Sequence, residues 1–199
     1  FHVLNLVTYC CPKYLILPKL RETLEEIKKR EVDEKPWYRA RVSIVGSEID
    51  DPSLTKMIEE VGAFVVSDRY CFGSTPGREV IELNDEEDAL TQICRHCMQV
   101  SECARYIADD KVAQRRATAD RLAREFRADG IIYEQMKFCD YWGFERALVS
   151  HIMNEEMGWP VLSIDRPYNA RSSGQLRTRF QAFVESLEIK RIQKEGGKR

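Results

Sequence analysis

The sequence lacks the features that most directly assign a chain to a functional class. It contains no Gly-x-Gly-x-x-Gly run and no phosphate-loop sequence, which argues against the standard modes of nucleotide binding. The net charge is only −2, and Lys and Arg are interleaved with Asp and Glu, so composition does not favour nucleic-acid binding. No stretch approaches the roughly 18–20 apolar residues that a membrane span needs. We therefore expect neither a nucleic-acid partner nor a membrane partner.

A secretory signal is also missing. The apolar run over residues 1–17 is interrupted by CCPK at 10–13 and has no cationic start or small-residue cleavage site. The chain begins inside this run with Phe1 rather than Met, so we expect a piece of a longer cytoplasmic protein without its N-terminal part. An odd number of cysteines, seven, then indicates reduced thiols, some of them ligands, rather than a disulfide framework.

Strand and helix patterns alternate from residue 41 onward. Short apolar runs predict strands at 42–45, 63–66, 131–133 and 160–164, with helical patterns between them. This order predicts an α/β fold, a Rossmann-like or flavodoxin-like parallel sheet of about four strands with helices on both faces. An amphipathic helix at 18–30 precedes it. We expect a helical connector at 1–40 from a missing N-terminal domain, a Rossmann-like C-terminal domain at 41–192 and a frayed tail at 193–199.

The most informative residue is Cys139, which follows a predicted strand and precedes a predicted helix. Apolar residues at helical spacing, Phe144 to Ile152 with His151 among them, mark that helix and predict that His151 is a core histidine. A helix N-terminus lowers a thiol pKa and favours the thiolate, which ligates metal or attacks an electrophile. The alternative is a small buried apolar cysteine with no chemical role.

Three of the predicted strand-to-helix loops carry unusual residues, at 47–52, 68–74 and 134–142. Because the carboxyl ends of parallel strands open on the same edge of a sheet, Cys71 and Cys139 are expected to face one crevice. Two thiols on one rim form a partial metal site. Neither segment has the repeated cysteine spacing of a ferredoxin-like cluster.

Two other groups are open to more than one interpretation. Cys94, Cys97 and Cys103, with His96, resemble a zinc or iron–sulfur motif, but no second pair completes it, and Cys94 and Cys97 simply share a face if the segment is helical. Near the last helix, Arg177 and Arg179, with Arg171 upstream, either bind an anion such as a phosphate at the helix N-terminus or are ordinary surface arginines.

Four ordered motifs resemble the 2-hydroxyacyl-CoA dehydratase and benzoyl-CoA reductase family. They are VGSEIDDP at 45–52, SDRYCFGS at 67–74, KFCDYWG at 137–143 and GQLRTRFQAF at 174–183. The resemblance covers about residues 41–190 and corresponds to the C-terminal half of an iron–sulfur subunit. It implies a 4Fe–4S cluster, a homologous iron–sulfur subunit as partner, an ATP-hydrolysing electron-activating component and an acyl-CoA substrate.

The resemblance also implies roles for single residues. Cys139 is the cluster ligand in KFC, the other ligands come largely from the N-terminal half, and Cys71 lies near the site or ligates directly. Arg177 and Arg179 are candidates for acyl-CoA or anion binding. An electron passed to a thioester requires nearby donors or acids, for which Tyr133, Lys137 and Tyr141 are placed.

Two short segments indicate which branch of the family the chain resembles more. CDYWG at 139–143 and DRPY at 165–168 favour a benzoyl-CoA reductase-like enzyme that passes low-potential electrons to an aromatic acyl-CoA. One alternative is a 2-hydroxyacyl-CoA dehydratase subunit, which eliminates water by a radical route. Others are a non-enzymatic iron–sulfur electron carrier of the same superfamily and a flavodoxin-like binding module whose cysteines only pack.

Overall fold

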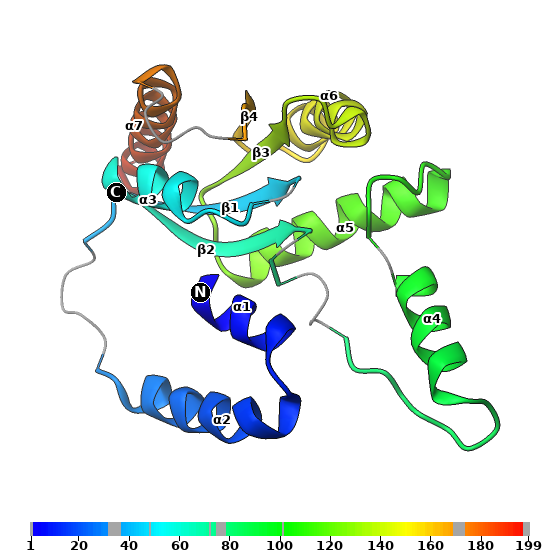
Figure 1. The fold of residues 1–199 in the computed structure, drawn as a ribbon. Coiled ribbons are helices and arrows are strands. Elements are labelled where there is room, and N and C mark those ends of the chain that lie inside the picture. Colours follow the sequence, from blue (N-terminus) through cyan, green and yellow to red (C-terminus); the bar gives the residue numbers. More distant parts are fainter. Residues whose placement is uncertain are drawn as a thin grey trace.

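A computed structural model describes residues 2–31, 37–47, 49–71, 73–74, 79–100, 102–168 and 174–196, except for the side chains of 100, 195 and 196. Helices and strands alternate as expected for an α/β fold (Figure 1). In chain order the elements are α1 (His2–Cys10), α2 (Lys13–Lys29), β1 (Ala40–Gly46), α3 (Ser53–Glu60), β2 (Ala63–Tyr70), α4 (Ala89–Val100), α5 (Asp109–Glu125), β3 (Gly130–Met136), α6 (Asp140–Glu155), β4 (Val161–Arg166) and α7 (Gly174–Gly196).

The four strands form one parallel sheet in the order β2-β1-β3-β4, which confirms the predicted fold class. This is the strand order of a flavodoxin-like sheet. After β1 the chain continues to one edge of the sheet, and after β3 it continues to the other. The carboxyl ends of β1 and β3 therefore flank the point at which open α/β sheets bind ligands.

Helices cover both faces of the sheet (Figure 1). One core lies between the sheet and α3 with α7, and its α7 members are Leu176, Phe180, Phe183, Val184 and Leu187. The second core lies between the sheet and α5 with α6 and contains Ala119, Ala123, Trp142, Val149 and Met153. Two faces buried at once explain why the strands are continuous apolar runs rather than alternating ones.

The strands are longer than predicted at the functional edge. β2 continues to Tyr70 and β3 to Met136, so Asp68, Arg69 and Glu134 are strand residues rather than loop residues. The strands were predicted too short because these positions are polar, and a strand prediction from sequence stops where the apolar run stops.

The predicted buried face of α6 is wrong. Phe144 and Leu148 are 78% and 55% exposed, and His151 is exposed rather than a core histidine. The face that packs on the sheet carries Trp142, Val149 and Met153 together with the buried Glu145. Because Glu145 is charged, the buried face has fewer apolar residues than the neighbouring stripe, and the sequence pattern therefore favoured that stripe.

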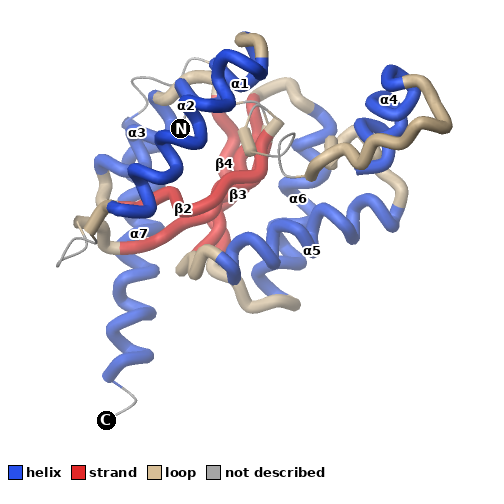
Figure 2. Tube along the Cα trace, turned by 90° about the horizontal axis from the view of Figure 1, so that it is seen from below, coloured by secondary structure: helices blue, strands red, loops and turns tan. Residues whose placement is uncertain are grey.

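The N-terminal helices contribute no buried residue. α2 begins at Lys13 directly after Pro12, so it is longer than the helix predicted from residue 18, and Pro18 lies inside it. Figures 1 and 2 show α1 and α2 at one side of the sheet and α4 away from it. The domain division at residue 40 stays a prediction.

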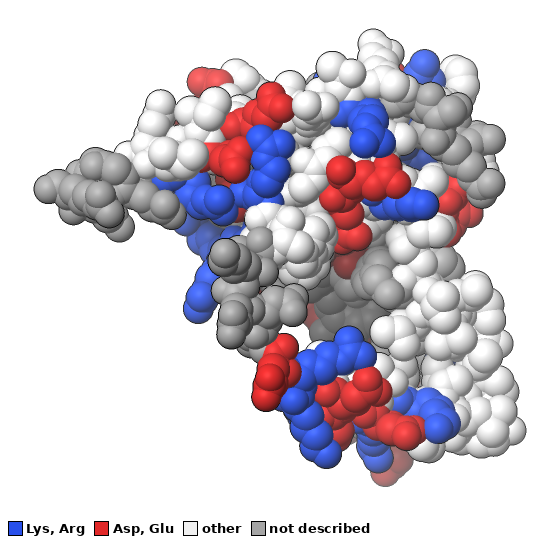
Figure 3. Space-filling model, turned by 90° about the vertical axis from the view of Figure 1, so that its left-hand side faces the viewer, with Lys and Arg blue, Asp and Glu red and all other residues white. Residues whose placement is uncertain are grey.

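Surface charge is mixed in sign. Figure 3 shows Lys and Arg interspersed with Asp and Glu on the face that it presents, without a patch of one sign. This mixture agrees with the low net charge of −2. Among the described helices, none is both long and apolar enough to cross a membrane.

Candidate functional site at the carboxyl edge of the sheet

A cavity of about 910 Å³ lies at the carboxyl ends of β1, β2 and β3. This volume is within the range of small-molecule and cofactor sites. Its wall is formed by the ends of β2 and β3 and the residue after β1, by the start of α6, by α4 and the segment after it, and by α5. The lining residues used below are Ser47, Arg69, Cys71, Cys97, Glu102, Cys103, Cys139, Tyr141 and Trp142.

Four of the seven cysteines line this one cavity. The structure brings together Cys71 and Cys139, as the sequence predicted, and adds Cys97 and Cys103. Cys94 does not line the cavity, so only part of the Cys94–Cys103 motif belongs to the site. Within the described residues, no three His, Cys, Asp or Glu side chains are close enough together to hold a metal ion. Thiol donors suit an iron–sulfur cluster, and the incomplete ligand set expected from the sequence stays a prediction.

Cys139 is held in a tight turn between β3 and α6. It occupies the N-cap position of α6, its amide donates to the Met136 carbonyl oxygen at 3.0 Å, and its own carbonyl accepts from the Gly143 amide at 2.9 Å. Phe138 adopts a φ of +71°, a region that aromatic residues rarely enter, and its side chain is 98% exposed. The turn therefore fixes a half-buried thiol at a helix N-terminus, which is the placement predicted from sequence.

A buried polar cluster joins the ends of β1, β3 and β4 below the cavity. Ser47 donates to the Glu134 carboxylate from both its hydroxyl group, at 2.9 Å, and its amide, at 3.1 Å. Arg166 Nε lies 2.7 Å from the other carboxylate oxygen of Glu134. Burial raises the pKa of Glu134, and Arg166 and Ser47 oppose that shift by stabilising the carboxylate. A Cβ on Gly46 would lie 2.2 Å from the Glu134 carbonyl oxygen, so only glycine allows this approach.

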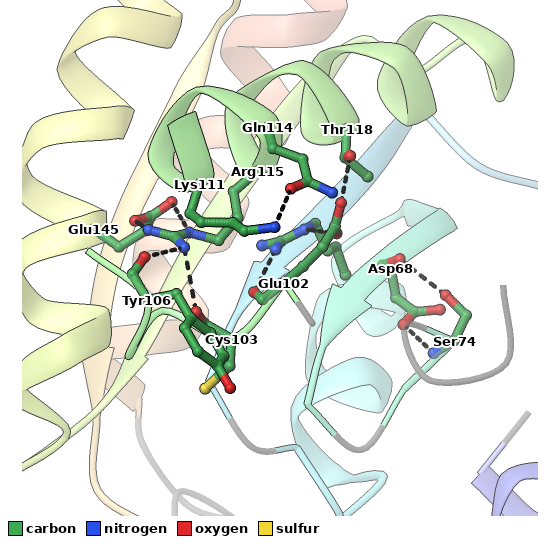
Figure 4. Close-up of polar contacts among 11 residues, drawn as sticks. Asp68, Ser74, Glu102, Cys103, Tyr106, Lys111, Gln114, Arg115, Thr118 and Glu145 are labelled. Atoms are coloured by element: carbon green, nitrogen blue, oxygen red, sulfur yellow. Dashed lines mark hydrogen bonds and ion pairs between the residues drawn. The ribbon is translucent and has the colours of Figure 1, made fainter. Parts of the chain in front are cut away.

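Two buried ion pairs lie beside the cavity. Arg69 pairs with Glu102 at 2.6 Å, and Arg115 pairs with Glu145 at 2.7 Å. Figure 4 shows Arg115 between Glu145 and the backbone near Cys103, and Glu102 beside Thr118. Charges this deeply buried require such partners. Arg69, Arg115 and Thr118 thus fix the segment around Glu102 and Cys103 against β2 and α5.

The three predicted proton donors lie in different environments. Tyr141 lines the cavity, with the Arg105 guanidinium 5.9 Å from its ring centroid. Lys137 is exposed and does not line the cavity, and Tyr133 is fully buried in the core below α5 and α6. The structure thus places only Tyr141 at the cavity wall, and the catalytic role of all three stays a prediction.

The predicted anion site at α7 has partners within the chain. Arg177 pairs with Glu60 at 3.0 Å, and Arg179 donates to the Ser163 carbonyl oxygen at 2.6 Å. Neither lines the cavity, and Arg171 lies outside the described residues. Acyl-CoA or anion binding by Arg177 and Arg179 stays a prediction.

The fold and the site together define a class: a doubly wound α/β domain with a thiol-lined cavity where its strand order reverses. Comparison with known proteins narrows this class. A family model described as "2-hydroxyglutaryl-CoA dehydratase, D-component" matches residues 1–187. The chain therefore belongs to the 2-hydroxyglutaryl-CoA dehydratase D-component family, which confirms the resemblance seen in the sequence.

Two curated relatives show the same family. The (R)-phenyllactyl-CoA dehydratase beta subunit of Clostridium sporogenes is 30% identical over 170 residues, which cover 85% of this chain and 43% of that protein. The lactoyl-CoA dehydratase subunit beta of Anaerotignum propionicum is 28% identical over 170 residues, covering 84% and 43%. The chain thus spans less than half the length of these relatives. They fit the dehydratase alternative better than the benzoyl-CoA reductase interpretation that the sequence favoured.

Proposed function

We propose that this protein is a component of a 2-hydroxyacyl-CoA dehydratase and that its cavity contributes to the acyl-CoA site. The observation that carries the proposal is the convergence of Cys71 and Cys139 on one cavity at the switch point of the sheet. Both relatives are named as dehydratase subunits that act on 2-hydroxyacyl-CoA thioesters. In the net reaction, hydroxide leaves carbon 2 of the acyl chain and a proton leaves carbon 3, so a double bond and water form without net oxidation.

The cofactor part of the proposal is a 4Fe–4S cluster with Cys139 as a ligand. When bound, the cluster supplies low-potential electrons. The half-buried position of Cys139 on the cavity wall, at the start of α6, supports its role as a ligand. Cys71 is a further candidate ligand on the same wall, and we expect the remaining donors from outside the described residues.

The partners in the proposal are a related iron–sulfur subunit and an ATP-hydrolysing component that delivers electrons. The names of both relatives as beta subunits support a partner subunit, whereas its iron–sulfur cluster and the ATP-hydrolysing component are what the resemblance to the family implies. Tyr141 is the candidate that is placed to hold or donate a proton at the cavity wall through its phenolic oxygen.

Cysteine substitution tests the cluster. The intact protein is reconstituted with iron and sulfide without oxygen, and the absorption, iron and sulfide contents are measured. Cys139→Ser should lose cluster absorption because serine is a poor replacement for a thiolate ligand, whereas Cys94→Ser, outside the cavity, should retain it. An intact cluster in Cys139→Ser would overturn the assignment.

Acyl-CoA binding tests the enzyme assignment separately from the cluster. Titration calorimetry with lactoyl-CoA and (R)-phenyllactyl-CoA should detect binding to the intact protein. A protein that holds a cluster but binds neither thioester would be an electron carrier rather than a dehydratase component. Conversion of a bound 2-hydroxyacyl-CoA to the enoyl-CoA, without ring reduction of benzoyl-CoA, would separate the dehydratase from the reductase.

A further inference from the structure

Two buried arginines differ in how completely their donors are used. Arg115 and Arg69 are each 1% exposed, and each pairs with a glutamate. Arg115 uses all three guanidinium nitrogens: Nε and Nη2 donate to Glu145, and Nη1 donates to the carbonyl oxygens of Cys103 and Tyr106. Arg69 donates from Nε to the Glu102 carboxylate and from Nη2 to the Glu102 carbonyl oxygen, both at 2.6 Å.

The third nitrogen of Arg69, Nη1, is buried and has no hydrogen-bond partner in the part of the chain that the structure describes. A buried donor without a partner is costly, so it is expected to meet an acceptor in the functional state. Arg69 lines the cavity, whereas Arg115 does not. The unused donor therefore belongs to the arginine that contributes to the cavity wall.

The guanidinium of Arg69 is also held in a fixed orientation. Its Nε and Nη2 are fixed by one residue, Glu102, which in turn accepts a hydrogen bond from Thr118. Its carbon lies 5.7 Å from the Trp142 ring centroid, in cation–π range. A donor held this firmly is preorganised for one acceptor position.

The charges around the cavity indicate an uncharged acceptor. The positive charge of Arg69 is already neutralised by Glu102. Along the cavity wall, Arg105 and Arg121 are balanced by Glu79 and Glu125. A carboxylate ligand would lie next to the carboxylate of Glu102 without a surplus positive charge, whereas a carbonyl oxygen requires only the N–H group.

We infer that Arg69 is a substrate-binding residue whose Nη1–H group donates a hydrogen bond to the thioester carbonyl oxygen of the acyl-CoA. This inference rests on the proposed function and adds to it the residue that recognises the reacting end of the substrate. The same hydrogen bond would favour any increase of negative charge on that oxygen.

The test compares two ligands that differ in one oxygen, propionyl-CoA and its thioether analogue S-propyl-CoA, by titration calorimetry on the intact protein. The wild type should bind propionyl-CoA about tenfold more tightly, as expected for a hydrogen bond from a charged donor. Arg69→Lys should bring the ratio of the two dissociation constants close to one. Arg115→Lys is the matched control and should keep the wild-type ratio.

The outcomes are separable. If the wild type binds no acyl-CoA, the proposed function fails and the inference fails with it. If the wild type binds both ligands but Arg69→Lys leaves their ratio unchanged, the inference alone is overturned. Folded Arg69→Lys protein that loses iron and sulfide while keeping the ratio would show that Arg69 serves the cluster, which also overturns it.

A second measurement covers the case in which Arg69→Lys does not fold. The carbonyl stretching frequency of ¹³C-labelled propionyl-CoA is measured by infrared difference spectroscopy on the wild type. A hydrogen bond from the guanidinium should lower this frequency below that of the thioester in an aprotic solvent. A frequency equal to the aprotic value would overturn the inference.

Discussion

Tyr133 is a fully buried residue whose hydroxyl group has no hydrogen-bond partner among the described residues. Burial raises its pKa above the ordinary tyrosine value, and the same holds for Tyr70, where Asp68 adds to the effect. Above about pH 10 the unfolded chain releases these protons while the folded chain keeps them. The free energy of unfolding should therefore fall as the pH rises from about 9 to 11.

The substitution Tyr133→Phe separates the effect of the hydroxyl group on stability from its predicted catalytic role. Because it removes an unsatisfied buried hydroxyl group, the free energy of unfolding near pH 7 should rise by about 1 kcal/mol. The decrease above pH 10 should become shallower, with the part due to Tyr70 remaining. Urea unfolding between pH 7 and 11 measures both effects. A loss of stability at pH 7 would mean that the hydroxyl group has a partner. A loss of turnover in the folded variant would support the catalytic role predicted from sequence.

For single residues, the sequence predicted some members of the site and missed others. Cys71 and Cys139 were predicted together because each follows a strand, and parallel strands share an edge. Cys97, Cys103 and Glu102 were not placed at the site, because they lie on the connection between β2 and β3 and reach the cavity only through tertiary packing. Arg69 gave no signal, because a buried ion pair depends on a partner 33 residues away.

Among the elements, α6 shows how a short pattern can mislead. Its exposed stripe contains Phe144 and Leu148, and its buried face contains Glu145, which pairs with Arg115 of α5. Periodicity assigns the apolar side to the core and has no means of recognising a charge that is neutralised by another helix. For α7 and α3 the buried faces are apolar and carry no such charge, so helical periodicity agrees with the observed core in both.

Substitutions on the two faces of α6 should therefore have unequal effects. Met153→Ala should lower the free energy of unfolding by about 2–5 kcal/mol, because it leaves a cavity in the core under the sheet. Leu148→Ala, on the exposed stripe, should change it by no more than about 0.5 kcal/mol. Urea denaturation followed by circular dichroism measures both. Similar losses in the two variants would show that the exposed stripe is covered by another part of the protein.

For the molecule as a whole, the question is how far the α/β unit depends on the N-terminal helices. α1 and α2 bury no residue, and among the described residues the side-chain hydrogen bonds from α1 to the rest include His2 with Thr55 at 3.4 Å and Tyr9 to the Gly73 carbonyl oxygen at 3.3 Å. The predicted domain boundary near residue 40 follows from a change of sequence pattern and is open to direct test.

Removal of residues 1–36 should leave a cooperatively folding unit. The expected loss is no more than about 2 kcal/mol of unfolding free energy, because these helices bury no residue and hydrogen bonds of this kind contribute about 1 kcal/mol each. Thermal and urea unfolding of the shortened chain, beside the intact chain, measures it. A broad transition or loss of near-ultraviolet circular dichroism would show that the boundary is wrong and that the helices belong to the same folding unit.

The pairing of β1 with β3 also has a consequence for biosynthesis. β1 ends at Gly46, yet the strand that completes its hydrogen bonding spans Gly130–Met136. Until about 90 further residues have been translated, the growing chain can pair β1 only with β2, and one edge of β1 stays open. Parallel pairing across such a separation is slow and exposes the chain to aggregation. Chaperone dependence during translation, ending when β3 leaves the ribosome, is the expected result.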